Sequence, residues 1–310
     1  MIKQSSIRRI CVATLALFIL LIIYFFPTKP VEIEEYLNYI NKDEMPIFLV
    51  DNSLYVARTT TIKDSDEINE KIENILETLT ESSKKSAYIK EGFKAVIPKN
   101  TKVLNYNLEN EILTINFSKE FLNVSTNMEE KLIEAIVYSL TEIPEIKQIV
   151  IFVNNERLTH LPNSGRKLPE YLDKTYGINK IYNLDSIKGT SKTTIYYIGK
   201  NKDNYYYIPI TKISNEKAEK VEIIIKELKE TPIYHTNLIS YLAASASITS
   251  YEMLESSMNL SFDNKLLAGL EDKNILEEVK YSIALSIRDT YGVNVINFQI
   301  AGQDEEKIEV

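Results

Sequence analysis

The chain carries one succession of apolar patterns twice, and this duplication limits the folds it can adopt. Apolar and polar residues alternate along residues 113–117, and the same alternation recurs 145 positions later along residues 258–262. Alternation with a period of two is typical of a strand that buries one face. Because self-similarity at a fixed spacing indicates a repeated structural unit, we expect two copies of one small module.

The other expected elements repeat in the same order. Apolar stripes at helical spacing cover residues 72–79 and 132–140 in the first copy, and residues 221–228 and 279–287 in the second. A closing strand is expected at residues 149–153 and 296–300, and a hairpin before the first helix at residues 46–62 and 194–213. Each copy therefore predicts the order strand, strand, helix, strand, strand, helix, strand.

The fold class that follows from this order is α+β. The core order helix, strand, strand, helix, strand lets two helices cover one face of a small, mostly antiparallel sheet in each module. A doubly wound nucleotide-binding fold is disfavoured because strands and helices do not alternate regularly. The chain also has only eight glycines, few for a fold that approaches phosphates with its backbone.

We divide the chain into seven segments. They are a cytoplasmic N-terminus (1–9), a transmembrane signal anchor (10–26), a spacer (27–45), module 1 (46–156), a connector (157–192), module 2 (193–303) and an acidic tail (304–310). Within the connector, Pro169 and Gly177 bracket residues 170–176 as an N1 proline and a C′ glycine bracket a short helix. We expect this helix to fix the two modules relative to each other and the tail to be a solvated end.

The N-terminal apolar run determines the expected compartment. Residues 10–26 are uncharged, and about 17 apolar residues are the minimum for a helix that crosses a bilayer. Lys3, Arg8 and Arg9 precede the run and acidic residues follow it, so the positive-inside rule places the N-terminus in the cytoplasm. A cleaved signal peptide needs small residues after the run, and residues 24–27 supply none. We therefore expect a single-pass protein of a bacterial cell membrane with extracytoplasmic modules.

Charge and cysteine content exclude several classes of protein. The net charge is −8, and subtracting the three basic residues before the anchor leaves −11 for the rest of the chain. Because the part of the chain after the N-terminus is so acidic, nucleic-acid phosphates and anionic lipid headgroups repel it. We therefore expect no nucleic-acid partner. Cys11 is the only cysteine, so neither a disulfide nor a cysteine-based zinc site can form within one chain.

The sequence predicts no catalytic, cofactor-binding or metal-binding residues. His160 and His235 are the only histidines, and neither an HExxH nor a GxSxG motif occurs. The acidic pair Glu129 and Glu130 and its equivalent, residues 277–278, could hold a cation or serve acid–base chemistry. Their places at the starts of two expected helices favour instead an interaction with the positive end of the helix dipole.

Tyrosine is the dominant aromatic residue of the chain. There are 20 tyrosines and no tryptophan, and residues 196–197 and 205–207 give the second hairpin an aromatic character. Aromatic strands can bind glycans or partner strands, but tyrosine is also simply a good strand former. We favour the interpretation that these tyrosines form strands.

Taken in order, these patterns resemble a known family. The sequence ILTINFSKEF at residues 112–121, LIEAIVYSLT at 132–141 and the strand at 149–154 resemble the GerMN domain, and residues 161–180 are similar to the connector of tandem GerMN proteins. The resemblance covers nearly all of residues 46–302. It implies a fold similar to the ring-building motif of secretion-system rings, and a role in sporulation or germination within a complex that joins mother cell and forespore.

Two functions stay open at this point. The first is a non-enzymatic, membrane-anchored scaffold that packs against further copies of itself or against other envelope or sporulation proteins. The alternative is an envelope protein that binds peptidoglycan or another cell-wall ligand through the aromatic hairpin. A secreted hydrolase would need a catalytic constellation that the sequence lacks. Because fold does not dictate function, the choice between the first two rests on the resemblance.

Overall fold

The computed structural model describes residues 14–15, 44–63, 65–202, 204–230, 237–267, 276–302 and 305–310. Contacts divide the chain into two units, Met1–Asn38 and Tyr39–Val310. In the first unit only Thr14 and Leu15 are described, and both are helical. The remainder of the predicted anchor (10–26), and the spacer as far as residue 43, lie outside the described residues. Within the described ranges, no helix combines the length and the apolar character needed to cross a bilayer.

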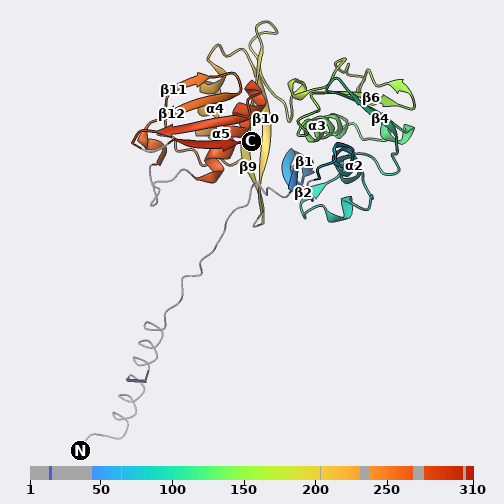
Figure 1. Cartoon of the computed structure of the whole chain (residues 1–310), viewed down its shortest axis with the longest axis horizontal. Coiled ribbons are helices and arrows are strands. Elements are labelled where there is room, and N and C mark those ends of the chain that lie inside the picture. Colours follow the sequence, from blue (N-terminus) through green and yellow to red (C-terminus); the bar gives the residue numbers. More distant parts are fainter. Residues whose placement is uncertain are drawn as a thin grey trace, which may run out of the picture. The chain divides into compact units, whose positions relative to one another are not determined.

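The second unit contains the duplicated succession of elements (Figure 1). Its first half runs β1 (Glu44–Asp51), β2 (Val56–Lys63), α2 (Ile68–Leu79), β3 (Phe93–Lys94), β4 (Val103–Glu109), β5 (Ile112–Phe117), α3 (Glu129–Leu140), β6 (Gln148–Val153) and β7 (Glu156–Arg157). The connector adds β8 (Ile181–Asn183). The second half runs β9 (Ser191–Asn201), β10 (Asn204–Ser214), α4 (Lys220–Lys229), β11 (Ile248–Met253), β12 (Ser257–Phe262), α5 (Glu277–Tyr291), β13 (Val295–Ile300) and β14 (Glu306–Glu309).

Each half contributes one four-stranded sheet, and the two sheets are built alike. Their strand orders are β4-β5-β6-β7 and β11-β12-β13-β14. The central pair is parallel in both, because a helix crosses over between its two strands, and the outer pairs are antiparallel. Leu113 pairs with Ile149 in the first sheet, and the equivalent Met258 pairs with Ile296 in the second. The α+β class is therefore confirmed, with mixed sheets.

The helices lie between a sheet and a hairpin rather than on one covered face alone. Ten of the twelve residues of α3 are buried, which requires contacts on more than one side of the helix. One apolar core joins Phe48 of β1, Ile136 of α3 and Ile151 of β6. A second core joins Ile208 of β10, Ile283 of α5 and the strands of the second sheet. Each module is thus layered as sheet, helices and hairpin.

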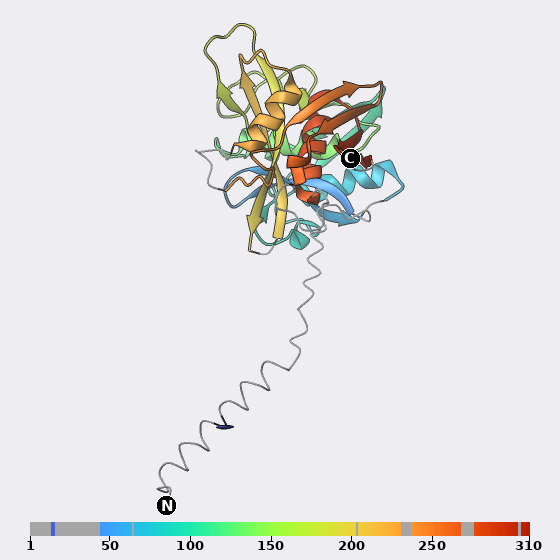
Figure 2. The same ribbon diagram turned by 90° about the vertical axis from the view of Figure 1, so that its left-hand side faces the viewer.

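The two hairpins lie outside the four-stranded sheets. They form a separate six-stranded sheet with the order β3-β1-β2-β10-β8, and β9 also pairs with β10. Figure 1 shows β9 and β10 between the helices of the two halves, and in Figure 2 the same yellow hairpin runs past the blue strands of β1 and β2. The physical reason is that these strands are buried on both faces, as in β1, where residues 47–51 are all buried.

Helices α3 and α5 pack against β1 and β9 of this shared sheet. The backbone N–H of Phe48 in β1 donates a 2.9 Å hydrogen bond to Ser139 Oγ of α3. The equivalent N–H of Tyr196 in β9 donates a 2.8 Å hydrogen bond to Ser286 Oγ of α5. Both serines are fully buried. An outward-facing strand amide that would otherwise lack a partner is satisfied by the same serine contact in each module.

The connector contains less helix than predicted. Only Lys174–Tyr176 is helical, as a single 3₁₀ turn, where residues 170–176 were expected. Leu172 forms a backbone bridge with Ile149, which holds residue 172 in an extended conformation. Asp173 then caps the turn by accepting a 2.8 Å hydrogen bond from the N–H of Thr175. The helix expectation was therefore wrong at its start, although Gly177 ends the turn with φ of 82°.

The acidic tail also departs from its prediction as a solvated end. Residues 306–309 form β14, which pairs antiparallel with β13 from Val295 to Phe298. Ile308 is buried in the second core and pairs with Ile296. The many charged residues of the tail made this strand hard to predict. Strand β14 adds an edge to the sheet, and its single apolar side chain packs into the core.

Candidate functional site between the two modules

The two hairpins meet through a backbone pairing and a side chain of the connector. Strands β2 and β10 pair at Arg58 and Tyr207. Beside that pairing, Asn179 Nδ2 donates 2.8 Å hydrogen bonds to the carbonyl oxygens of Val56 and Pro209, and its Oδ1 accepts one of 2.9 Å from the N–H of Val56. The buried side-chain amide of Asn179 therefore makes hydrogen bonds to the backbones of both hairpins, as a paired strand residue would.

Two equivalent carboxylates face each other near this junction. Glu142 follows α3, and Asp289, 147 positions later, lies in the last turn of α5. Lys174 Nζ lies 2.8 Å from Glu142 Oε1 and 2.8 Å from Asp289 Oδ1. Arg288 donates to Glu142 through Nη1 at 3.0 Å and Nη2 at 2.7 Å, and to Asp289 through Nε at 2.8 Å. Arg58 Nη2 lies 3.7 Å from Glu142 Oε2. We call these five residues the charge cluster.

The carboxylates of the charge cluster are buried, and the cluster joins four parts of the unit. Its members come from β2, the end of α3, the connector and α5, and the side chains of Glu142 and Asp289 are only 3% and 1% exposed. Burial alone would raise the pKa of the Glu142 carboxyl, but Arg288, Lys174 and Arg58 hold it well below its usual range. Asp289 is likewise held low by Arg288 and Lys174 against its burial, and Tyr196 Oη donates to its carboxylate. Both carboxylates are therefore ionised at neutral pH.

A cleft of about 1020 Å³ opens beside the charge cluster. Its lining includes the five cluster residues together with Pro144 and Tyr291, and contains no histidine or cysteine among the described residues. Carboxylates held this firmly in the ionised form do not act as general acids near neutral pH. The cleft therefore borders the charge cluster that joins the two modules.

The acidic pair at the start of α3 holds the connector. Glu129 is buried and accepts hydrogen bonds from the backbone N–H groups of Asn163 at 2.8 Å and Ser164 at 3.1 Å. Its neighbour Glu130 lies 2.8 Å from Lys180 Nζ and 2.8 Å from Arg166 Nη1. The equivalent residues 277–278 begin α5, where the first is exposed and the second half-buried. The two pairs share a helix position but differ in what surrounds them.

The tyrosines of the second hairpin belong mostly to the junction. Tyr196, Tyr197, Tyr206 and Tyr207 are buried. Tyr206 Oη donates a 3.0 Å hydrogen bond to Asp51 Oδ2, and its ring packs edge-on against Phe93 at 4.8 Å between centroids. The aromatic hairpin of module 2 therefore packs over module 1.

His160 takes no part in this site. His160 is exposed in the connector, with its Nδ1 3.0 Å from Thr159 Oγ1. His235 lies outside the described residues. Within the part of the chain that the structure describes, no group of three or more histidine, cysteine, aspartate or glutamate residues is placed to hold a metal ion.

Sequence reasoning did not single out the residues of the charge cluster. Glu142 and Asp289 share the offset of 147 that relates the two second helices, so the repeat contained a signal for their equivalence. Nothing in that spacing indicates that they face each other. Lys174 and Asn179 stand in the connector, where no repeat marks them.

The comparisons with known proteins agree with this architecture. A family model described as "Germane: Sporulation and spore germination" matches residues 37–159. The spore germination protein GerM of Bacillus subtilis strain 168 is 26% identical over 265 residues, which cover 84% of this chain and 72% of that protein. The solved structure of the tandem GerMN domains of the sporulation protein GerM from Bacillus subtilis matches with a TM-score of 0.77 at 24% identity, covering 86% of this chain and 96% of that one. The chain is therefore GerM-like and built from tandem GerMN modules, as the resemblance in its sequence predicted.

Proposed function

We propose that this chain is a non-enzymatic, membrane-anchored scaffold that acts outside the cytoplasm in sporulation or germination. In this proposal the two modules take part in a ring or channel assembly between mother cell and forespore, together with further copies of the chain or other sporulation proteins. The observation that supports the proposal best is the buried charge cluster, which ties β2, α3, the connector and α5 into one body.

A scaffold needs this kind of junction because its binding surfaces must keep a fixed relation to one another. A buried ion pair that loses one partner costs about 3–5 kcal/mol, so separation of the modules would be strongly opposed. Two modules held in one orientation can bind neighbours repeatedly with the same geometry, which closed or helical assemblies require. The cleft beside the cluster would then be part of the joint rather than a site of turnover.

A localisation experiment tests the proposal. The full chain is fused at its C-terminus to a fluorophore that folds outside the cytoplasm and is imaged in the host through growth and sporulation. We expect enrichment at the membrane that engulfs the forespore. A fusion of residues 1–45 alone to the same fluorophore is the control for the anchor and should stay uniformly distributed. Uniform signal from the full chain in vegetative cells, with none at the forespore, would contradict the proposal.

The alternative function is binding of peptidoglycan or another cell-wall ligand, for which the second hairpin exposes few aromatic side chains. Four of the five hairpin tyrosines are buried, which leaves Tyr205 with its neighbours Lys200 and Tyr241 near the surface. Lys200 Nζ lies 2.8 Å from Tyr205 Oη, and Tyr241 is 41% exposed. Co-sedimentation of the chain with purified cell wall, compared with a Tyr241→Ala variant, tests this function. We expect no more than background sedimentation from either protein if the scaffold proposal holds.

A further inference from the structure

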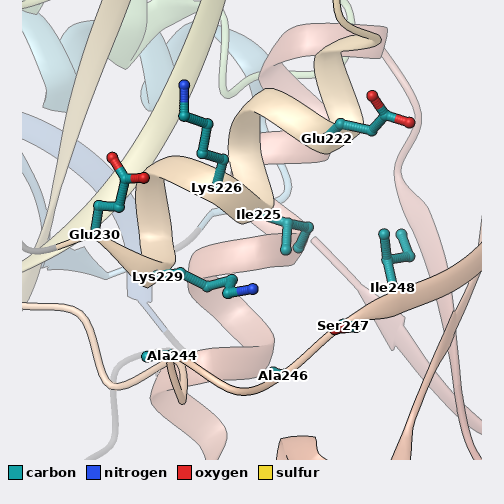
Figure 3. A pocket seen from close by; sticks show the side chains of 9 residues that line it. All are labelled: Glu222, Ile225, Lys226, Lys229, Glu230, Ala244, Ala246, Ser247 and Ile248. Carbon is teal, nitrogen blue, oxygen red and sulfur yellow. The ribbon is translucent and has the colours of Figure 1, made fainter.

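Each module has a groove between its first helix and the edge strand of its four-stranded sheet. The first groove, of about 630 Å³, lies between α2 and β4 and includes Glu73, Leu76 and Glu77 of the helix together with its C-cap residue Thr80. The second groove, of about 430 Å³, lies between α4 and the residues that lead into β11 (Figure 3). Its helix residues are Glu222, Ile225, Lys226 and Lys229, each 149 positions after its counterpart in the first groove. The duplication has therefore placed a groove at an equivalent position in each module.

The edge strands beside these grooves each pair with only one neighbour within the described residues. Strands β4 and β11 stand at the ends of their sheets, and 145 positions separate their equivalent residues. In β11, Tyr251 and Met253 are 37% and 53% exposed, on the face that carries Leu260 and the helices. Their counterparts in β4, Tyr106 and Leu108, are half-buried. An edge strand that exposes apolar side chains and free backbone groups can accept a strand from another chain.

The two helices that flank the edge strands carry opposite net charge. Helix α2 contains three glutamates and one lysine, whereas α4 contains three lysines and two glutamates. At two equivalent positions along the grooves, Glu77 of α2 and its C-cap residue Thr80 correspond to Lys226 and Lys229 of α4. Figure 3 shows Lys229 and Ile225 extending from α4 toward the segment that carries Ala246 and Ile248. Glu222 and Glu230 also line the second groove, so the complementary charge lies on the helices α2 and α4 rather than on the whole grooves.

We propose that a second copy of this chain occupies these surfaces, with β4 of one copy pairing with β11 of the next. Such a pairing continues the sheet across the boundary and brings the acidic α2 of one copy beside the basic α4 of its neighbour on the same face. It is heterologous, so each copy retains one free edge and the contact can be repeated into a ring or a filament. This inference rests on the proposed scaffold function and gives it a contact between copies.

Cross-linking of full-length chains in membranes tests the pairing. Two single-cysteine chains are made in a Cys11→Ser background, one with Asn107→Cys on β4 and one with Glu252→Cys on β11. These two residues are equivalent, exposed and on the face of their strands away from the helices. With a short bismaleimide, the mixture should give several-fold more dimer than either chain alone. Absence of dimer from the mixture, or an equal yield from either chain alone, would overturn the proposal.

The opposite edges of the same sheets provide the matched control. Cysteines at Glu156 of β7 and Lys307 of β14 should give only background dimer when the two chains are mixed. A yield equal to that of the β4 and β11 cysteines would show that proximity in the membrane, rather than the proposed pairing, causes the cross-link. That result would also overturn the inference.

Charge reversal provides a second test that does not depend on cysteine placement. Glu77→Lys in the chain with the β4 cysteine should reduce the heterologous dimer by about fivefold, because it places like charges between α2 and α4. Lys229→Glu in the chain with the β11 cysteine should restore the yield, which a folding defect in the first variant would not allow. Failure of the second substitution to restore the dimer would count against the pairing.

The outcomes separate the inference from the proposed function. Enrichment at the engulfing membrane without the cross-link would overturn the β4 to β11 pairing and leave the scaffold function standing. The cross-link together with uniform signal in vegetative cells would support the pairing and contradict the role in sporulation.

Discussion

Module 1 and module 2 share their buried contacts and differ in what meets their surfaces. Both keep a parallel central strand pair in the same register, and both fasten the second helix to the hairpin through a buried serine, Ser139 or Ser286. The helix starts have diverged: Glu129 binds the connector, whereas Glu277 is exposed. Packing inside a module is therefore alike in the two copies, whereas the cations that join the modules stand at positions without a charged counterpart.

The charge cluster shows this divergence most clearly. Glu142 and Asp289 are equivalent, yet the cations around them come from positions without a charged counterpart, since Arg288 corresponds to Thr141. The two carboxylates form a joint because cations reach them from both modules, Arg58 and Arg288, and from the connector, Lys174. Neutralising Glu142, which meets three cations, should therefore destabilise the protein more than neutralising Asp289, which meets two.

The largest effect is expected from neutralising the carboxylates of the charge cluster. Glu142→Gln leaves Arg58, Lys174 and Arg288 with Asp289 as their one anion in the cluster, and loss of a buried pair costs about 3–5 kcal/mol. Asp289→Asn should cost less, because Glu142 still meets all three cations. Urea denaturation of the fragment Tyr39–Val310, followed by circular dichroism, measures both free energies of unfolding.

The pH dependence of stability gives the same comparison a second readout. The pKa of Glu142 is lowered on folding, so its contribution is present above the unfolded pKa, about 4.3, and is lost as the pH falls below that value toward the folded pKa. The wild type should therefore lose stability below about pH 4 more steeply than Glu142→Gln does. Parallel pH profiles for the two proteins would show that the cluster does not stabilise the joint electrostatically.

The next effect concerns the amide that bridges the modules. Asn179→Ala would leave the N–H and C=O of Val56 and the C=O of Pro209 without their partner, which we expect to cost about 3 kcal/mol. Asn179→Asp keeps the acceptor but not the donors, and should fall between alanine and the wild type. Equal stability of the aspartate variant and the wild type would mean that the bonds donated by Nδ2 contribute nothing.

The repeat made the elements of both modules predictable, but not the way the modules join. Helices and strands follow from periods that a linear sequence displays, as at residues 113–117. The shared sheet depends on Asn179 and Arg58, whose partners lie far away along the chain. One signal was available: residues 47–50 are apolar without alternation, which is typical of a strand covered on both faces. The strand in the tail was not predicted because the tail's two apolar residues, Ile308 and Val310, are too few to establish a period.

A smaller effect is expected from the serine contacts that the modules share. Ser139→Ala leaves the buried N–H of Phe48 without an acceptor, and Ser286→Ala does the same to Tyr196, at about 1–2 kcal/mol each. Because the contact is equivalent in the two modules, the two variants should lose similar stability in urea denaturation. A difference of more than about 1 kcal/mol would break the equivalence of the modules at this position.

The smallest effect should distinguish the two acidic helix starts. Glu129→Gln weakens the hydrogen bonds from Asn163 and Ser164 and should cost about 1 kcal/mol, since bonds to an ionised acceptor are the stronger ones. Glu277→Gln removes an exposed charge at the equivalent position and should change the free energy of unfolding by less than about 0.5 kcal/mol.

Acid titration sharpens the contrast between these two positions. Burial alone would raise the pKa of Glu129, but the hydrogen bonds from residues 163 and 164 lower it, so its contribution is lost as the pH falls below about 4.3. Partial burial raises the pKa of Glu277, so its ionised form opposes folding and protonation should slightly stabilise the fold.

Proteolysis of the connector near Asn163, compared between the two variants at neutral pH, reports the same difference locally. Faster cleavage in Glu277→Gln than in Glu129→Gln would show that the connector is held by something other than the helix start of module 1.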